Sequence, residues 1–90
     1  MITISYAITV CKEINEIQRL VKLLLETKRD QDEIVILYDI KNGSLSVEEY
    51  LRSQNVEETK FIWYPFEFEG DFSKLKNELT GLCKGDYIFN

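Results

Sequence analysis

The sequence predicts an α/β domain with a three-layer α/β/α, Rossmann-like architecture and a mostly parallel, four-stranded sheet. Short runs of β-branched and aromatic residues alternate with segments of helical periodicity in the order β-α-β-α-β-α-β. The connections between these segments are short, which favours right-handed crossovers and helices on both faces of a parallel sheet. No internal repeat or linker divides the chain, so we expect residues 1–90 to form a single domain.

The first half of the chain predicts two buried strands around an amphipathic helix. Ile2–Val10 is a β-branched run without clean polar alternation, which is typical of a central strand covered on both faces. A helix is predicted over Ile14–Thr27, because apolar residues recur there at helical spacing. These residues are Ile17, Leu20, Val21 and Leu24. Glu33–Ile40 is the second predicted strand, and it is also expected to be fully buried.

The middle of the chain predicts a turn, a short helix and an edge strand. Residues 41–44 have the composition of a turn. Ser46 and Glu49 have the spacing of a capping box, which predicts a helix that begins there and continues through about Arg52. Lys60–Tyr64 is predicted to be a short aromatic strand that Pro65 ends, since proline is tolerated at a sheet edge but not in its interior.

The last third predicts a third helix and a fourth strand. Asp71 is a suitable N-cap, and the residues after it repeat at helical spacing. This predicted apolar face consists of Phe72, Leu75, Leu79 and Leu82. Gly85 is predicted to end the helix. Gly85–Asn90 then predicts a turn followed by a buried strand, of which Tyr87–Phe89 is the start.

Composition excludes several classes of function. The net charge of −5 argues against a nucleic-acid partner, which needs a basic face. No apolar run approaches the roughly 20 residues that span a bilayer. No secretory leader is recognisable after Met1, so we expect a cytoplasmic protein. The absence of histidine excludes Ser-His and Cys-His nucleophiles and most zinc sites. Cys11 and Cys83 are expected to be small buried apolar residues.

The polar residues that follow the predicted strands are the candidates for a binding site, because ligands of open parallel sheets bind at the carboxyl ends of the strands. The candidates are Thr9, Cys11, Lys12, Glu13, Asp39, Gly70, Asp71, Lys76 and Asn77. Each also has a structural interpretation. Asp39 could cap a turn, Glu13 could favour the dipole of the first helix, and Asp71 could be a helix N-cap. Lys76 and Asn77 could belong to a solvated helix face.

The aromatic residues between positions 61 and 68 are expected to contribute to core and loop packing rather than to a sugar-binding platform. They are Phe61, Trp63, Tyr64, Phe66 and Phe68. No glycine-rich phosphate loop of either common pattern is present in the sequence. From composition and spacing alone, the chain is therefore a parallel α/β domain whose strand ends could bind a ligand.

Four segments in order resemble the start of a family 2 glycosyltransferase with the GT-A fold. They are Ile4–Glu13, Asp32–Asp39, Gly70–Asn77 and Gly85–Phe89, and together they extend over essentially the whole chain. The resemblance implies a GT-A type half-domain that binds a nucleotide-diphosphate sugar, with UDP or a similar nucleotide.

The resemblance also implies which positions contact the nucleotide. Thr9, Cys11 and Glu13 after the first strand, and Asp39 at the end of the second, match the positions that hold the base and ribose. Carboxylates and backbone groups suit these hydrogen-bonding partners. The region of Asp71, Lys76 and Asn77 matches the third helix, which approaches the nucleotide in the family.

The resemblance places the family's Asp-x-Asp metal motif, its catalytic base and its acceptor-binding half beyond Asn90. We therefore expect this chain to be the amino-terminal part of such an enzyme, truncated before the motif and inactive by itself. A divalent metal, Mn²⁺ or Mg²⁺, is expected only in a full-length enzyme, where it would neutralise the diphosphate. Neither a catalytic residue nor a metal ligand is assigned to this chain.

Two other classes of function remain open. The chain could be a non-enzymatic α/β module that forms a homo-oligomer through exposed sheet edges, in particular through Tyr87–Phe89. It could also be a phosphoacceptor signalling domain, which has a similar alternation of strands and helices. That class requires an acidic pair after the first strand, whereas Lys12-Glu13 supplies a single acid.

Overall fold

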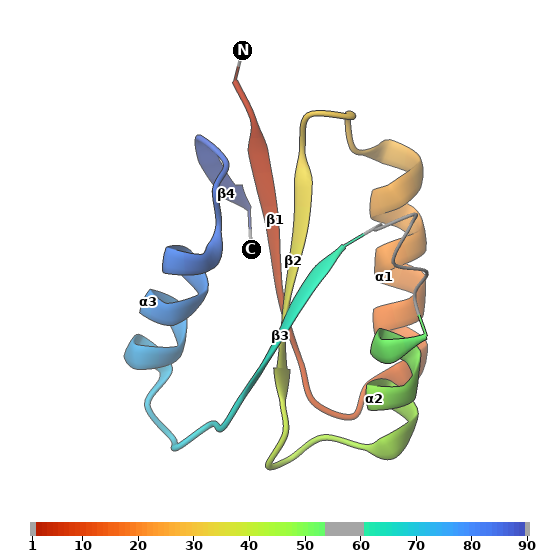
Figure 1. Ribbon diagram of the computed structural model, residues 1–90, viewed down its shortest axis with the longest axis vertical. Coiled ribbons are helices and arrows are strands. Elements are labelled where there is room, and N and C mark those ends of the chain that lie inside the picture. The colour runs from red at the N-terminus through yellow and green to blue at the C-terminus, as the bar shows by residue number, and fades with distance from the viewer. Residues whose placement is uncertain (1, 54–60, 90) are drawn as a thin grey trace.

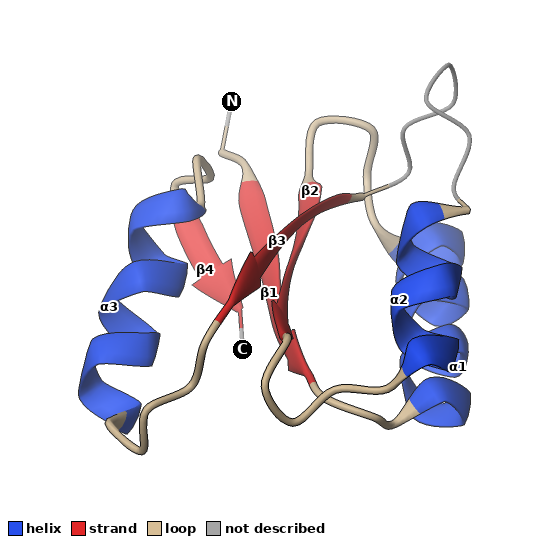
Figure 2. Cartoon of the chain, turned by 60° about the horizontal axis from the view of Figure 1, so that its bottom comes forward, coloured by secondary structure: helices blue, strands red, loops and turns tan. Residues whose placement is uncertain are grey.

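Four parallel strands form one sheet in the order β3-β2-β1-β4, with helices on both faces (Figure 1). The computed structural model describes residues 2–53 and 61–89. The elements are β1 (Ile4–Val10), α1 (Ile14–Thr27), β2 (Glu33–Asp39), α2 (Leu45–Arg52), β3 (Ile62–Phe66), α3 (Phe72–Leu82) and β4 (Tyr87–Phe89). Helices α1 and α2 cover one face and α3 covers the other (Figure 2). The predicted fold class, a three-layer Rossmann-like half-domain, is confirmed.

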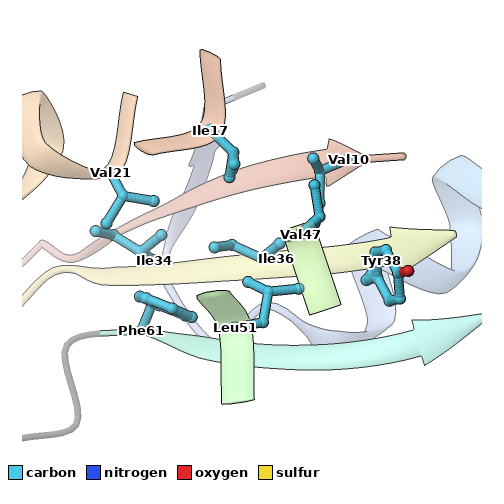
Figure 3. Close-up of a cluster of buried hydrophobic side chains, with 9 residues drawn as sticks. All are labelled: Val10, Ile17, Val21, Ile34, Ile36, Tyr38, Val47, Leu51 and Phe61. Carbon is cyan, nitrogen blue, oxygen red and sulfur yellow. The ribbon is translucent and has the colours of Figure 1, made fainter. Parts of the chain in front are cut away.

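The larger part of the core lies between the sheet and helices α1 and α2. Helix α1 has the predicted bounds, and Ile17 and Val21 on its apolar face are buried. Helix α2 contributes Val47 and Leu51, which are both fully buried. The buried cluster is completed by residues of the strands and by Phe61 (Figure 3): Val10, Ile34, Ile36, Tyr38 and Phe61. The alternate side chains of β2 therefore point into this layer, as a central strand requires.

The core on the opposite face of the sheet is smaller and is covered by α3. Val35 and Leu37 of β2 point to this side and are completely buried. They pack with Ala7 of β1, Phe66 of β3 and Leu79 of α3. Burial of β2 on both faces explains its continuous apolar sequence, Ile34 to Tyr38.

The cap of α2 differs from the predicted one. Ser44, not Ser46, is the N-cap: its backbone is extended, with φ −132° and ψ 156°. Its Oγ accepts a hydrogen bond from the Val47 backbone N–H at 3.3 Å. Ser46 lies inside the first helical turn, so the predicted capping box of Ser46 and Glu49 was wrong. The two serines differ in backbone conformation, which a spacing rule does not detect.

Strand β3 also differs from its prediction. It extends through Pro65 to Phe66, whereas Pro65 was expected to end the strand. Because β3 lies at the edge of the sheet, alternate backbone N–H groups need no ladder partner, and proline is tolerated. Phe66 lies beyond the predicted end of the strand, but it belongs to β3 and is buried. The predicted first residue of this strand, Lys60, lies outside the described residues.

The end of α3 and the exposure of β4 require two further corrections. Helix α3 has the predicted N-cap, Asp71, but it ends at Leu82 rather than at Gly85. Strand β4 has the predicted position, but its side chains are exposed rather than buried, with Phe89 65% exposed. Strand β4 is at the edge of the sheet and is paired with β1 alone among the described strands, so its apolar sequence does not by itself lead to burial. Asn90 lies outside the described residues.

The amino ends of the strands are tied together by polar side chains. The Ser5 hydroxyl donates to Glu33 Oε2 at 2.5 Å and accepts from the Gly85 N–H at 2.7 Å. Glu33 Oε2 also accepts from the Lys84 N–H. Asp32, which is buried, accepts from the Ile4 N–H at 2.9 Å and pairs with Arg29. This amino-end clasp of side chains fixes β4 against β1.

Candidate functional site

The carboxyl ends of β1 and β2 bring three of the predicted site residues together. Cys11 follows β1 and lies beside Asp39, because β1 and β2 are paired in register up to Val10 and Tyr38. The Cys11 thiol donates to Asp39 Oδ2 at 3.6 Å. The Cys11 backbone N–H donates to Glu13 Oε2 at 2.8 Å. Cys11, Glu13 and Asp39 therefore form one polar cluster, which we call the strand-end cluster.

The carboxylate of Asp39 is engaged within the chain. Only 2% of this residue is exposed. Its Oδ1 accepts from the backbone N–H groups of Lys41 and Asn42, at 3.0 and 3.2 Å. Its Oδ2 accepts from Asn42 Nδ2 at 2.8 Å. Asp39 thus caps the turn after β2, which is the structural role considered from the sequence, and it also positions Cys11.

These contacts determine the protonation states of Asp39 and Cys11. Burial alone would raise the pKa of Asp39, but hydrogen bonds from Asn42, Lys41 and Cys11 outweigh it and lower the pKa. Burial raises the pKa of the Cys11 thiol, and the negative charges of Asp39 and Glu13 raise it further. At neutral pH Cys11 is therefore a protonated hydrogen-bond donor and Asp39 a carboxylate. A thiol in this state is a poor nucleophile.

Neither cysteine is fully buried, contrary to the prediction. Cys11 and Cys83 both have intermediate exposure. Cys83 packs at the margin of the smaller core, and burial raises the pKa of its thiol. Cys11 lies where the chain leaves the sheet, and its sulfur has a polar neighbour, Asp39.

Glu13 occupies the N-cap position of α1 without capping the helix. Its side chain accepts no hydrogen bond from the first turn and instead holds the Cys11 backbone. Glu13 is exposed, so its carboxylate faces solvent beside the carboxyl end of β1. Among the members of the strand-end cluster, Glu13 is therefore the carboxylate most accessible to a ligand.

Thr9 and Lys76 line an apolar groove at the free side of β1. This edge groove lies between Leu20 and Leu24 of α1 on one side and Leu75, Lys76 and Leu79 of α3 on the other, with Thr9 at β1. Its cavity volume is about 600 Å³. Lys76 is exposed, and its side-chain ammonium group forms no ion pair with the described residues.

Of the seven residues that the resemblance matches to the nucleotide, the last two are Asp71, the N-cap of α3, and Asn77 on α3. Asp71 Oδ1 accepts from the Lys74 N–H at 3.1 Å, so Asp71 is the N-cap that the sequence indicated. It lines a smaller depression, about 300 Å³ in volume, whose lining includes Glu67 and Glu78. Asn77 is exposed and lines neither the edge groove nor this depression. The seven predicted residues therefore do not converge on one pocket.

The strand order defines where a ligand is expected. From β1 the chain proceeds to β2 and β3 on one side of β1, and then to β4 on the other side. In open parallel sheets the ligand crevice lies at such a reversal, outside the carboxyl ends of the strands. Thr9 lines the edge groove on the β4 side of β1, whereas the strand-end cluster joins the carboxyl ends of β1 and β2 on the other side.

Residues 2–53 and 61–89 contain no group of three His, Cys, Asp or Glu side chains that could hold a metal ion. The sequence has a single Asp-x-Asp pattern, Asp30-Gln31-Asp32. It lies at the amino end of β2, and Asp32 is held by Arg29 and the Ile4 N–H. These residues do not fit the expected divalent metal.

The sequence did not indicate two features of this region. Asn42 binds both oxygens of Asp39, and an Asn three residues after an Asp at a strand end is a signal that could have suggested this turn. The edge groove has no local signal, because it depends on which strands are neighbours.

The described helices include none that is long and apolar enough to cross a membrane. Comparison with protein-family models, with curated proteins and with solved structures finds no match to this chain.

Proposed function

We propose that this chain is the nucleotide-diphosphate-sugar-binding portion of a glycosyltransferase, for a uridine or similar nucleotide. The observation that carries the proposal is the position of the strand-end cluster at the carboxyl ends of the neighbouring strands β1 and β2, beside the reversal of strand order at β1. A solvent-facing carboxylate there, Glu13, can accept hydrogen bonds from the N–H group of a base or from ribose hydroxyls.

The members of the site have different roles in this proposal. Glu13 and the backbone beside Thr9 contact the nucleoside directly. Asp39 acts as a positioning residue, since its oxygens already hold Asn42 and Lys41 and orient Cys11. Lys76, which has no ionic partner among the described residues, supplies a positive charge for the diphosphate from the side of α3.

The proposal assigns binding, not chemistry, to these residues. No described side chain is placed as a catalytic base, and no described cluster fits the metal that would neutralise the diphosphate. We therefore expect weak nucleotide binding and no sugar transfer by the chain alone. Sugar transfer from a nucleotide sugar by the purified 90-residue chain would contradict this expectation. The cytoplasmic location that accompanies this function also stays a prediction.

Titration of the ¹⁵N-labelled chain with uridine diphosphate, followed by NMR, tests the proposal. We expect saturable shifts of the Thr9, Cys11 and Glu13 amides, with a dissociation constant of roughly 1 mM, equivalent to about −4 kcal/mol. Glu13→Ala should abolish the shifts. Glu16→Ala, which removes an exposed carboxylate from the first turn of the same helix, should leave them unchanged. Shifts confined to other parts of the chain would refute the site.

A second candidate function is self-association, and the exposure of β4 favours it. Tyr87 and Phe89 are 63% and 65% exposed although they lie in a strand. Apolar side chains on an open sheet edge favour pairing with another copy. Light scattering at tens of micromolar tests this candidate: a dimer or larger species supports it, and a monodisperse monomer contradicts it.

A further inference from the structure

The carboxylate of Asp39 is filled by hydrogen-bond donors of the chain itself. An ionised carboxylate accepts about four hydrogen bonds, shared between its two oxygens. Oδ1 of Asp39 accepts from the backbone N–H groups of Lys41 and Asn42. Oδ2 accepts from the side-chain amide of Asn42 at 2.8 Å and from the Cys11 thiol at 3.6 Å. These donors together occupy the accepting positions of Asp39.

Burial and ionisation also separate Asp39 from a ligand. Only 2% of the residue is exposed. Burial alone would raise the pKa of Asp39, but the hydrogen bonds from Asn42, Lys41 and Cys11 lower it, so the group is a carboxylate at neutral pH. A carboxylate has no proton to donate to a ligand oxygen. A ligand hydroxyl that donates to Asp39 must first displace a donor of the chain, and such an exchange gains little free energy.

Glu13 differs from Asp39 in both respects. It is exposed, and its Oε2 accepts a hydrogen bond from the Cys11 backbone N–H at 2.8 Å. That hydrogen bond orients the carboxylate at the end of β1 and leaves Oε1 for a ligand. Cys11 therefore connects the two carboxylates, because its thiol occupies Asp39 and its backbone positions Glu13.

A single accessible carboxylate serves the base of a nucleoside better than its sugar. The ring N–H of uracil points away from the sugar, so one carboxylate does not reach both this group and the 2′-hydroxyl. The ring N–H lies between two carbonyl groups and is more acidic than a sugar hydroxyl. It therefore forms the stronger charge-assisted hydrogen bond with a carboxylate such as Glu13.

We propose that the site recognises the base of a nucleotide through Glu13 and does not recognise the 2′-hydroxyl of its sugar, so that it binds ribonucleoside and 2′-deoxyribonucleoside diphosphates equally. Uracil and thymine have the required ring N–H, whereas cytosine has an acceptor nitrogen in that position. Cys11 and Asn42 determine this specificity, because they hold Oδ2 of Asp39. The inference rests on the proposed function and changes the role that the resemblance implies for Asp39.

The test compares uridine diphosphate, 2′-deoxyuridine diphosphate and cytidine diphosphate in NMR titrations of the ¹⁵N-labelled chain, followed at the Cys11 and Glu13 amides. We expect the dissociation constants of the two uridine nucleotides to agree within about threefold. That of cytidine diphosphate should be roughly tenfold higher or more, because its ring nitrogen has no proton to donate to Glu13. A preference of more than about threefold for uridine diphosphate over its deoxy form would overturn the proposal. Equal binding of cytidine diphosphate would overturn the assignment of the base to Glu13.

Substitution of Cys11 tests its role in specificity. Cys11→Ala removes the thiol from Asp39 Oδ2 and leaves an accepting position unoccupied. This variant should prefer uridine diphosphate over the deoxy form by roughly fivefold or more. Cys11→Ser retains a donor and should bind both nucleotides equally. So should Cys83→Ala, which removes the thiol at the margin of the smaller core. An unchanged ratio in Cys11→Ala would refute the role of the thiol.

NMR titration of the ¹³C-labelled carboxyl groups of the free chain tests the occupied state of Asp39 without a nucleotide. The pKa of Asp39 should lie below the usual range of an aspartate, and Asn42→Ala should raise it, since one donor is lost. Asn77→Ala removes an exposed amide of α3 and should leave this pKa unchanged. An ordinary pKa for Asp39 in the unsubstituted chain would contradict the proposal.

This inference and the proposed function fail in different ways. Absence of shifts with all three nucleotides contradicts the proposed function, and the inference with it. Binding that selects the ribonucleotide, with shifts at Cys11 and Glu13, supports the proposed function and contradicts the inference alone.

Discussion

The two halves of β1 differ in what surrounds them. Its amino half, Ile4–Tyr6, is paired on both sides and is held by the amino-end clasp of Ser5, Asp32 and Glu33. Its carboxyl half, Ala7–Val10, is paired with β2 alone and borders the edge groove. The same strand is thus closed where polar side chains stabilise the fold and open where the candidate site lies.

This difference indicates how stability and binding are divided in a small domain. A chain of this size has a thin core, and the amino-end clasp supplements it with buried hydrogen bonds. The carboxyl half also buries side chains, those of Ala7 and Val10, but it leaves backbone groups accessible on the side away from β2. Substitutions in the two halves should therefore have very different costs.

The largest effect is expected where β4 meets the amino half of β1. A methyl group on Gly85 would lie 2.6 Å from the Ser5 backbone nitrogen, so Gly85→Ala forces β4 away from β1. We expect a loss of about 1–3 kcal/mol in the free energy of unfolding, measured by urea denaturation.

Gly81→Ala is the matched control for this substitution. Gly81 lies in α3, where an added Cβ meets nothing within 4 Å. Alanine is the better helix former, so this change should stabilise the chain by up to about 1 kcal/mol. Equal destabilisation by the two substitutions would show that β4 is not closely packed against Ser5.

Substitutions that remove one hydroxyl group from each half of β1 compare directly how much the two halves contribute to stability. Ser5→Ala removes the buried group that accepts from Gly85 and donates to Glu33, and it should cost about 1–2 kcal/mol. Thr9→Val removes the exposed hydroxyl of the open half and should change stability by no more than about 0.5 kcal/mol. Chemical denaturation of both variants measures the difference. A larger loss of stability for Thr9→Val than for Ser5→Ala would contradict the expected difference between the two halves of β1.

The smallest expected effect on stability appears only at acidic pH and involves Asp32. The Arg29 side chain donates a hydrogen bond to Asp32, and so do the backbone N–H groups of Ile4 and Arg29. These hydrogen bonds lower the pKa of Asp32 from 3.8 to about 2. A carboxyl group with a lowered pKa stabilises the fold above its unfolded pKa. This contribution is present above about pH 4 and is lost as the pH falls toward 2. Asp32→Asn should reduce this part of the pH dependence between those values, measured by urea denaturation at each pH.

Local patterns predicted the elements that depend on local interactions. The bounds of α1 followed from its apolar spacing, and the Asp71 cap of α3 followed from residue type. Predictions failed for features that depend on which elements are neighbours in the folded sheet. Pro65 lies within β3 because that strand is at the edge of the sheet, and Leu20 is exposed because no strand pairs with the carboxyl half of β1 on that side.

The candidate site was predictable only in part, for the same reason. Cys11, Glu13 and Asp39 follow adjacent strands, so their proximity could be expected from the alternation of elements. The edge groove could not, because Thr9 and Lys76 come together only through the strand order β3-β2-β1-β4 and the position of α3. The nucleotide assignment stays a prediction.

The open carboxyl half of β1 is the central claim, and amide hydrogen exchange of the free chain tests it most directly. The N–H groups of Ile8 and Val10 point toward β2, whereas that of Thr9 points to the open edge. The account predicts slow exchange at Ile8 and Val10 and fast exchange at Thr9 in the monomer. Exchange at Thr9 as slow as at its two neighbours would show that this edge is already paired and would contradict the account.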